Sequence, residues 1–356
     1  MVLYPQNVAM SFESTKGFPM MKRIVLPLFP VFAIANAQQI DWKNAEEIRE
    51  GVRLVRLDRK VKLDKPRSED QLKKDQARAD KNAGKPGILK VEPDFRPMKI
   101  VVMRVNLKLE GLTFTGTGRD KDWGEKMPDY PKDNQNSIIR TLRVRTADFM
   151  KDARKPVEEG GRGLDMIVAC NSAPWAPWEK PFNHKYGNPH GLEISDGIIV
   201  NDKGHNSPMF VIYKSGEIDI AQGPLPKDQY DKLWLATTGF GSIMIKGERA
   251  PGIAQGYERP LMPRMTYGLD AERNYLYLVT VDGRQPGWSE GAIGEDLYNI
   301  FKDAGAYDVI DMDGGGSATL CYWDAEKQQP VIVNRHNYKA NYFRPCGMNM
   351  GIYLKK

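Results

Sequence analysis

The stretch VIDMDGGGS (residues 309–317) decides the fold class and the candidate site of this chain. Residues 309–312 are typical of a buried strand, and this strand runs directly into a carboxylate, Asp313, and three glycines. Glycine runs cost backbone entropy, so they indicate a positive φ or the close approach of another backbone or a ligand. Successive glycine amides can form a concavity that binds an anion. The candidate site residues here are Asp313, Gly314, Gly315, Gly316 and Ser317; the alternative is that Asp313 only braces a tight turn.

Asp311 precedes Asp313 by two residues, so a regular strand places both side chains on one face. A second carboxylate this close raises the proton affinity of one member of the pair. Hydrogen bonds from glycine amides act in the opposite direction and favour the ionised form. A water-activating base or a nucleophile at Asp313 is therefore physically reasonable.

A second segment of the same form precedes this stretch. The β-rich run 275–281 stops at Asp282-Gly283-Arg284, and Ser289 is then a candidate cap for a helix that ends near Gly305. An apolar stripe at helical spacing supports this helix: Ile293, Leu297, Ile300, Phe301 and Ala304. Because the helix leads to the next strand, we expect Asp282 and Asp313 at one sheet edge. Paired carboxylates are what glycosidic bond cleavage commonly uses.

Two arginines border these segments. Arg264 follows Pro263, and Arg284 follows Gly283. Arginine gives bidentate contacts to phosphate, so the two side chains are candidates for one anion site near Gly314 to Gly316. The alternative for each is a surface salt bridge or a simple turn, which is the usual fate of an isolated arginine.

The remaining chain reads as one sheet-dominated α+β domain with helices between some strands. Hairpin signals stand at Asp196-Gly197 and Ser215-Gly216, and Thr146 begins a helix. No internal repeat and no clear linker follow residue 95, so the domain is assigned to residues 100–356. Further strands are expected at residues 100–109, 113–117, 166–169, 192–200, 209–213, 217–220, 243–245 and 348–354.

The N-terminal part predicts export. A charged Met21-Lys22-Arg23, an apolar run at 24–34 and a small-x-small Ala35-Asn36-Ala37 form a signal peptide over residues 1–37, with extra residues in front of it. The run is too short to span a membrane. Residues 38–99 then hold a strand at 52–57 and a charged segment at 60–85, which we read as a solvated, dispensable insertion without chemistry. We expect a periplasmic or extracellular protein.

Composition narrows the partners and cofactors. The net charge of +6 over 356 residues is mild, and no nucleic-acid motif is present, so no nucleic-acid partner is expected. The four histidines form no metal-spaced cluster, although carboxylates leave calcium or magnesium open. The three cysteines match no metal site and allow one disulfide at most; buried free thiols are the simpler interpretation.

Three segments together resemble the phosphodiester glycosidase family. Residues 263–268 (PRMTYG) resemble its Pro-Arg-Thr-Ala-x-Gly strand, residues 281–285 (VDGRQ) its Asp-Gly-Arg/Gln segment, and residues 310–319 its Asp-Gly-Gly-Gly-Ser signature. Glu295 falls near the family's helix glutamate. Asn171 matches the asparagine of Asn-Gly-Gly-x-Phe, but Ser172 and Ala173 replace the glycines and a loop with Trp175 and Trp178 follows. The sugar or aglycone site therefore differs from the family pattern.

The resemblance implies a domain of mixed, largely antiparallel strands and hydrolysis of a sugar-1-phosphodiester at the sugar–phosphate bond, with no required cofactor. It implies Asp313 as base or nucleophile and Asp282 or Glu295 as the second carboxylate. Arg264 and Arg284 would hold the phosphate, and the glycines, Ser317 and Asn171 would contact the substrate. Two alternatives stay open: a phosphodiesterase that cuts on the phosphorus side, and a non-catalytic carbohydrate-binding or exopolysaccharide-assembly protein on the same fold.

Overall fold

The computed structural model describes residues 39–178, 184–204, 206–254, 260–336 and 343–355. The chain divides into two units, Met1–Ala37 and Gln38–Lys356, and the described residues all belong to the second. The predicted signal peptide therefore lies outside the described residues. No helix in the described part is long and apolar enough to cross a membrane.

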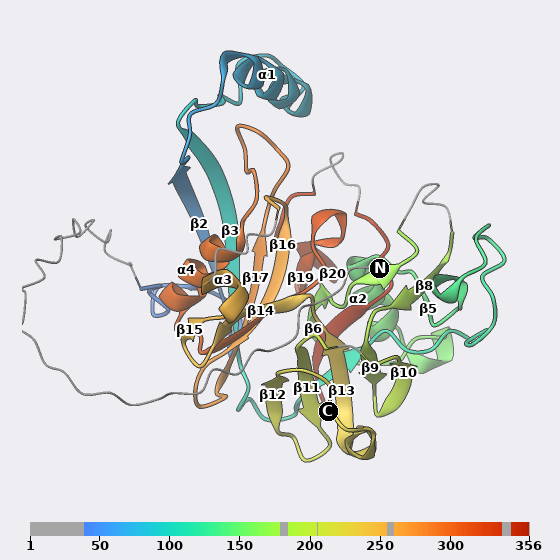
Figure 1. The fold of residues 1–356 in the computed structure, drawn as a ribbon. Coiled ribbons are helices and arrows are strands. Elements are labelled where there is room, and N and C mark those ends of the chain that lie inside the picture. The colour runs from blue at the N-terminus through green and yellow to red at the C-terminus, as the bar shows by residue number, and fades with distance from the viewer. Residues whose placement is uncertain (1–38, 179–183, 205, 255–259, 337–342, 356) are drawn as a thin grey trace, which may run out of the picture. The chain divides into compact units, whose positions relative to one another are not determined.

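An eight-stranded antiparallel sheet carries the segments singled out by the sequence (Figure 1). Its centre is β17 (Tyr275–Val281), β16 (Arg264–Leu269) and β18 (Asp308–Asp311), which lie side by side in that order. In this register Thr266 of β16 lies opposite Asp311 of β18, and Arg264 lies opposite Val281 of β17. The flanking strands are β1 (Glu46–Arg49), β2 (Val52–Lys62) and β3 (Phe95–Asn106) on one side and β14 (Gly241–Ile245) and β15 (Glu248–Arg249) on the other.

Three smaller sheets complete the domain, and every strand pair described is antiparallel. The first has the order β20-β19-β6-β21-β4, the second β10-β9-β13-β11-β12, and the third β5-β8-β7. Their bounds are β4 (Leu112–Gly116), β5 (Thr141–Leu142), β6 (Asp165–Asn171), β7 (Trp175–Ala176), β8 (Tyr186–Pro189), β9 (Leu192–Ser195), β10 (Ile198–Asp202), β11 (Met209–Tyr213), β12 (Ile218–Ala221), β13 (Leu233–Thr238), β19 (Leu320–Asp324), β20 (Gln329–Ile332) and β21 (Asn349–Leu354).

The expected fold class, a sheet-dominated α+β domain of largely antiparallel strands, is confirmed. The parallel component implied by a mixed sheet is not found among the described strands. Both hairpin signals are correct: β9 and β10 turn at Asp196 and Gly197, which have φ values of 53° and 76°, and β11 pairs with β12. A paired positive φ suits the twist of a two-residue hairpin, which explains why an Asp-Gly sequence stands there.

The main core lies between the large sheet and the two five-stranded sheets. Tyr267 and Met265 of β16 pack in one buried cluster with Val168 of β6, Ile352 of β21 and Phe210 of β11. Burial of such side chains removes apolar area from water, at roughly 25 cal/mol per Å². This packing fixes β16 and β18 against β6, and so sets the position of the chain that follows β18.

Helix α4 (Gly294–Ala304) covers the other face of the large sheet, as Figure 1 shows. Leu297, Ile300 and Phe301 pack against Val279 and Val309, so the predicted apolar stripe is confirmed. Gly305 ends the helix with a φ of 91°, as expected of a glycine C-cap. The predicted Ser289 cap is wrong, because the helix begins only at Gly294. The Ser289 hydroxyl instead donates to the Asp282 carbonyl at 2.6 Å.

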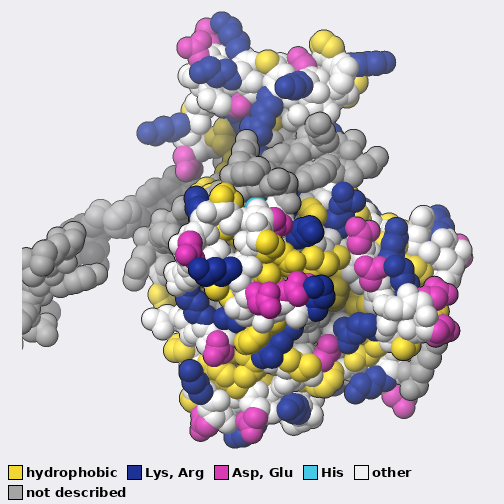
Figure 2. Space-filling model, turned by 90° about the vertical axis from the view of Figure 1, so that its right-hand side faces the viewer, with side chains coloured by type: hydrophobic (Ala, Val, Ile, Leu, Met, Phe, Trp, Pro, Cys, Tyr) yellow, Lys and Arg dark blue, Asp and Glu magenta, His cyan; other side chains and the backbone are white. Residues whose placement is uncertain are grey.

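The charged segment differs from its prediction. Residues 60–62 are the end of β2, which pairs with β3 along its whole length, and Val61 packs against the cluster beneath α4. Helix α1 (Glu69–Ala83) follows, with Ser68 as N-cap and Gly84 as a left-handed C-cap. Figure 1 places α1 beyond the ends of β2 and β3, and Figure 2 shows Lys and Arg side chains standing out from this part at the top of the view. The interpretation of residues 60–85 as a solvated insertion therefore holds only in part, because the segment begins with the end of β2 and continues mostly as helix α1.

The other helices are short. Helix α2 (Thr146–Arg154) begins at Thr146 as predicted, but its N-cap is Arg145 and Thr146 makes no cap there. The Thr146 hydroxyl donates instead to the Asn349 side chain at 2.7 Å. Helix α3 spans Pro251–Ala254. The three cysteines are free and buried, in agreement with the simpler of the two interpretations.

Candidate active site

Asp313 stands just past the end of β18, where the chain leaves the sheet. Its N–H donates to the Ser172 carbonyl at 3.0 Å, and its own carbonyl accepts from the Asn171 side-chain amide at 2.6 Å. The Asn171 side-chain oxygen accepts in turn from the Thr319 N–H at 2.9 Å. Asn171 therefore braces both ends of the glycine turn. It is not among the residues that line the pocket described below, so it is a positioning residue and not the predicted substrate contact.

The glycines are required by close approach. A Cβ on Gly314 would stand 2.6 Å from the Pro263 carbonyl oxygen, which no side chain tolerates. Gly315 has a φ of 62°, and its N–H donates to the same carbonyl at 2.9 Å. The turn is thus pressed against the start of β16, as the sequence argument expected of a glycine run.

The predicted anion concavity of glycine amides is only partly available. The Gly315 amide is bonded to Pro263, and the Ser317 amide donates to the Gly314 carbonyl at 3.1 Å. Residues 315–317 form a short 3₁₀ turn, and neither Gly316 nor Ser317 lines the pocket. The Gly314 amide acts on the Asp313 carboxyl, whose pKa it lowers. The amides of Gly315 and Ser317 are therefore occupied by protein carbonyls, which does not fit their predicted role in phosphate binding.

Asp313 lines a pocket of about 420 Å³. Burial raises the pKa of the Asp313 carboxyl to about 6, and the neighbouring Asp311 adds to the increase. Arg344, the Ser317 hydroxyl and the Gly314 amide hold the pKa lower than burial alone would. A carboxyl with such a pKa exchanges a proton near neutral pH, which suits acid–base work. The lining residues are Pro174, Trp175, Trp178, His190, Phe240, Met262, Arg284, Asp313, Gly314, Gly315 and Arg344.

Two guanidinium groups line this pocket without a hydrogen-bond or ion-pair partner among the described residues. Arg284 lies against Gly315: a Cβ built there would be 3.4 Å from its Nη1 and 3.5 Å from its Nη2. Arg344 stands over the Trp175 ring at 6.0 Å, and its buried Nε has no acceptor. Within the described parts of the chain, neither side chain forms a hydrogen bond or an ion pair. Unpaired guanidinium groups beside a carboxyl are suited to an anionic ligand.

Arg264 does not join them, which corrects the prediction of a phosphate clamp formed by Arg264 and Arg284. Its Nη1 pairs with Asp311 at 3.1 Å, its Nε donates to the Ala292 carbonyl at 2.9 Å, and its Nη2 donates to the Pro260 carbonyl at 2.7 Å. Arg264 is 1% exposed and Asp311 0%. Both side chains lie on the α4 face of the sheet, where the charge of each is needed to neutralise the other.

Asp282 ends β17 as predicted but does not share the pocket with Asp313. Its two carboxylate oxygens accept from the Trp288 indole N–H at 3.0 Å and from the Arg335 N–H at 2.8 Å. Burial raises the pKa of this carboxyl to about 6. With both oxygens occupied, Asp282 organises the loop that contains Arg284. Asp282 and Asp313 thus follow strands that end at the same sheet edge, on either side of the start of β16, as expected, but Asp282 does not line the pocket with Asp313.

Glu295 is likewise not the second carboxylate. It lies in the first turn of α4 and forms a bidentate ion pair with Arg249, with N–O distances of 2.6 and 2.9 Å. About a third of its side chain is exposed, and it is absent from the pocket lining. Glu295 does lie on the predicted helix, but its side chain pairs with Arg249 of β15 at the surface.

Arg344, His190, Phe240 and Met262 line the pocket and were not singled out by the sequence. Arg344 stands in an unremarkable Phe-Arg-Pro-Cys segment, and no spacing links it to residues 313–317. Of these four residues, only Met262 could have been suggested from the sequence, because it immediately precedes Pro263 and Arg264. Among the described residues, no group of histidines, cysteines and carboxylates is placed to hold a metal ion.

Comparison with known proteins supports the class of fold and then the family. The chain is similar to the catalytic domain of zebrafish N-acetylglucosamine-1-phosphodiester alpha-N-acetylglucosaminidase, a domain auto-inhibited by its pro-peptide, with 16% identity, a TM-score of 0.54 and coverage of 89% of this chain and 87% of that one. Residues 178–353 match the model of the family described as phosphodiester glycosidase, so the predicted resemblance is confirmed.

Two further solved structures are less similar. One is a hypothetical protein from Synechocystis, with 11% identity, a TM-score of 0.46 and coverage of 73% of this chain and 60% of that one. The other is a protein from Burkholderia pseudomallei K96243, with 11% identity, a TM-score of 0.45 and coverage of 74% and 76%. No curated protein sequence matches this chain.

Proposed function

We propose that this protein is a hydrolase that cleaves the sugar–phosphate bond of a sugar-1-phosphodiester. The observation that carries the proposal is the pocket in which Asp313 lies with the unpaired guanidinium groups of Arg284 and Arg344. The family match supports the class of reaction, and the name of the zebrafish enzyme suggests an α-linked N-acetylglucosamine as the sugar.

The reaction follows from the charges in the pocket. Asp313 takes a proton from a water molecule, whose oxygen attacks the anomeric carbon. The bond between that carbon and the phosphate oxygen breaks, and its electron pair leaves with the phosphate monoester. Arg284 and Arg344 stabilise the charge that develops on this leaving group. Because a phosphate monoester leaves readily, no second carboxylate is needed as general acid, which fits the positions of Asp282 and Glu295 outside the pocket.

Direct attack by the Asp313 carboxylate on the anomeric carbon is the second form of the same role. It would leave a covalent glycosyl-enzyme that water then hydrolyses. Both forms require the ionised carboxylate, and both place the phosphate next to the arginines. The stereochemistry of the released sugar distinguishes them, because a single displacement inverts the anomeric centre and a double displacement retains it.

Exposed aromatic rings at the pocket fit the uncharged part of such a substrate. Trp178 is 60% exposed and Phe240 is 41% exposed, and both line the pocket. Aromatic faces bury the apolar face of a sugar ring or an apolar aglycone at low entropic cost. Export to the periplasm or the cell exterior remains part of the proposal and is supported by the tripartite pattern of residues 21–37.

The test is hydrolysis of an α-linked N-acetylglucosamine-1-phosphodiester in ¹⁸O-labelled water, followed by mass spectrometry of both products. We expect the label in the sugar hydroxyl and an unlabelled phosphate monoester. Label in the phosphate would instead identify a phosphodiesterase that attacks phosphorus. Saturable binding of the substrate without any turnover would favour the carbohydrate-binding or exopolysaccharide-assembly alternative, for which the exposed Trp178 and Phe240 are the favourable observation.

A further inference from the structure

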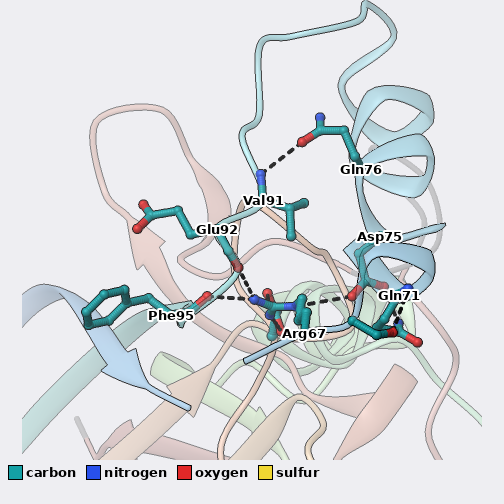
Figure 3. Close-up of polar contacts among 9 residues, drawn as sticks. Arg67, Gln71, Asp75, Gln76, Val91, Glu92 and Phe95 are labelled. Carbon is teal, nitrogen blue, oxygen red and sulfur yellow. Dashed lines mark hydrogen bonds and ion pairs between the residues drawn. The ribbon is translucent and has the colours of Figure 1, made fainter. Parts of the chain in front are cut away.

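A buried arginine connects the segment of α1 to the loop that contains Arg284. The Arg67 side chain is only 6% exposed, and its Nη2 donates to both carboxylate oxygens of Glu290 at 2.6 Å. Its Nε pairs with Asp75 of α1 at 3.3 Å. Figure 3 shows the guanidinium between Asp75 on one side and the chain at Glu92 and Phe95 on the other. One side chain thus holds three separate parts of the molecule.

The same arginine closes the α1 segment on itself. Its Nη1 donates to the carbonyls of Glu92 and Phe95, the latter at 2.8 Å. Gln76 of α1 donates to the Leu89 carbonyl at 2.8 Å and accepts from the Val91 N–H at 3.0 Å (Figure 3). We call residues 66–92 the α1 brace. These contacts give the brace a defined shape although it holds few apolar side chains.

The brace meets the Arg284 loop at two points. The first is the ion pair from Arg67 to Glu290, whose backbone carbonyl accepts from the Arg284 N–H at 3.1 Å. The second is Gly287, where an added Cβ would be 3.0 Å from the Leu89 Cβ. Between these points, Gln285 and Ser289 exchange backbone hydrogen bonds. The brace therefore contacts the loop through the Glu290 side chain and at the Gly287 backbone.

Arg284 needs such support. Its φ of 58° lies in the left-handed region, which is unfavourable for a residue with a side chain and persists only where the surroundings impose it. Its guanidinium, by contrast, has no partner among the described residues that could hold it over Gly315. The position of this side chain is thus set by its backbone, and the backbone is held at Glu290.

We propose that Arg67 is a positioning residue for the anion site: through Glu290 it fixes the backbone of Arg284 and so directs that guanidinium into the Asp313 pocket. The segment predicted to be dispensable is then part of the machinery that binds the substrate. The inference rests on the proposed function in one respect, that the anion held by Arg284 is a phosphate.

The test compares Arg67→Met with Lys73→Met, the matched control, in the full-length protein. Lys73 is an exposed residue of α1 that takes no part in the brace contacts described above. Hydrogen exchange is measured at the amides of residues 284–290, and the Kd of inorganic phosphate is measured by calorimetry. Both measurements are made on these two variants, on Arg284→Ala and on the Arg67→Met/Arg284→Ala double variant.

We expect faster exchange at residues 284–290 in Arg67→Met than in the wild type or in Lys73→Met. The Kd for phosphate should rise about tenfold in Arg67→Met, the scale of a misplaced bidentate group. The double variant should bind phosphate no more weakly than Arg284→Ala, because Arg67 acts only through Arg284. Unchanged exchange in Arg67→Met, or losses that add in full in the double variant, would overturn the proposal.

Arg67→Lys covers the case in which Arg67→Met does not fold. It retains the positive charge beside Glu290 but loses the planar fork that also reaches Glu92 and Phe95. The same changes are expected at smaller amplitude, and wild-type exchange and phosphate binding in Arg67→Lys would count against the proposal. If the wild type binds phosphate but hydrolyses no sugar-1-phosphodiester, the proposed function fails while the role of Arg67 is still measured.

Discussion

Two arginine–aspartate groups stand close together at the ends of β16 and β18, and they are built differently. Arg264 and Asp311 form a buried ion pair at 3.1 Å, and each nitrogen donor group of the guanidinium has a protein acceptor. Asp313 is only two residues further along the chain. It lies in an open pocket with Arg284 and Arg344, whose guanidinium groups form no hydrogen bond or ion pair in the described parts of the chain.

The difference separates a structural from a functional use of the same residue types. In the Arg264–Asp311 pair the protein itself supplies the opposite charge, so there is nothing left for a ligand to satisfy. In the Asp313 pocket two cations have no ion-pair partner among the described residues, an arrangement that suits an anionic ligand. Substitution in the Arg264–Asp311 pair is therefore expected to lower stability, and substitution in the Asp313 pocket is expected to lower turnover.

The largest effect is expected for Asp313→Asn. The substitution removes the carboxylate that we propose activates water or attacks the sugar, so kcat should fall at least ~100-fold, the scale of a general base. Stability should not fall with it. The folded-state pKa of Asp313 is raised to about 6, so this carboxyl favours folding fully only below its unfolded pKa, and this contribution to the unfolding free energy is lost as pH rises through 6. At pH 7.5 the wild-type protein therefore has no such contribution to lose on substitution.

The matched control is Glu295→Gln, which removes the surface carboxylate that pairs with Arg249. Its kcat should remain near the wild-type value, because Glu295 does not line the pocket. The measurements are steady-state turnover and melting temperature for both variants at pH 7.5. Comparable loss of kcat in the two variants would contradict the placement of the reaction at Asp313.

The second expected effect is on stability and concerns Arg264→Met. Removal of the cation leaves Asp311 buried and unpaired, which costs about 3–5 kcal/mol of unfolding free energy. The same substitution at Arg284 removes a charge that no protein group needs, and it should change stability by less than about 1 kcal/mol. Urea unfolding of both variants checks this contrast, and equal losses would show that Arg284 has an ion-pair role like that of Arg264.

A smaller effect is expected in the pH dependence of turnover. If Asp313 must be ionised, kcat/KM should rise about tenfold between pH 5 and pH 7, since its pKa is about 6. Burial also raises the pKa of Asp282 to about 6, so Asp282→Asn is needed to separate the two groups. The rise should survive in Asp282→Asn. A flat profile there would assign the titration to Asp282 and weaken the case for Asp313.

Periodicity and turn chemistry were enough to predict much of the fold. The apolar stripe of α4, its glycine C-cap and the two hairpins were correct because they depend on residues close in sequence. The helix α1 was underestimated for the opposite reason. Its stability comes from the Ser68 cap and from polar contacts of Arg67 and Gln76 with distant residues, and these leave no apolar pattern to detect.

The site could be predicted only in part. Asp313 and its glycines could be found from the sequence, because a glycine run after a strand indicates a positive φ or a close approach of another group. The partners of Arg264 and Glu295 could not be read, since they depend on the register of Thr266 against Asp311 and on a β15 residue, Arg249. Arg344 enters the pocket from a segment with no motif, so tertiary structure alone reveals it.

The most direct test of the central claim is a crystal structure of Asp313→Asn with an intact α-linked N-acetylglucosamine-1-phosphodiester. We expect the anomeric carbon beside residue 313 and the phosphate oxygens within about 3 Å of both the Arg284 and Arg344 guanidinium groups. Arg264 should remain paired with Asp311, away from the ligand. A phosphate bound outside the reach of both Arg284 and Arg344, or a substrate that binds away from residue 313, would contradict the account.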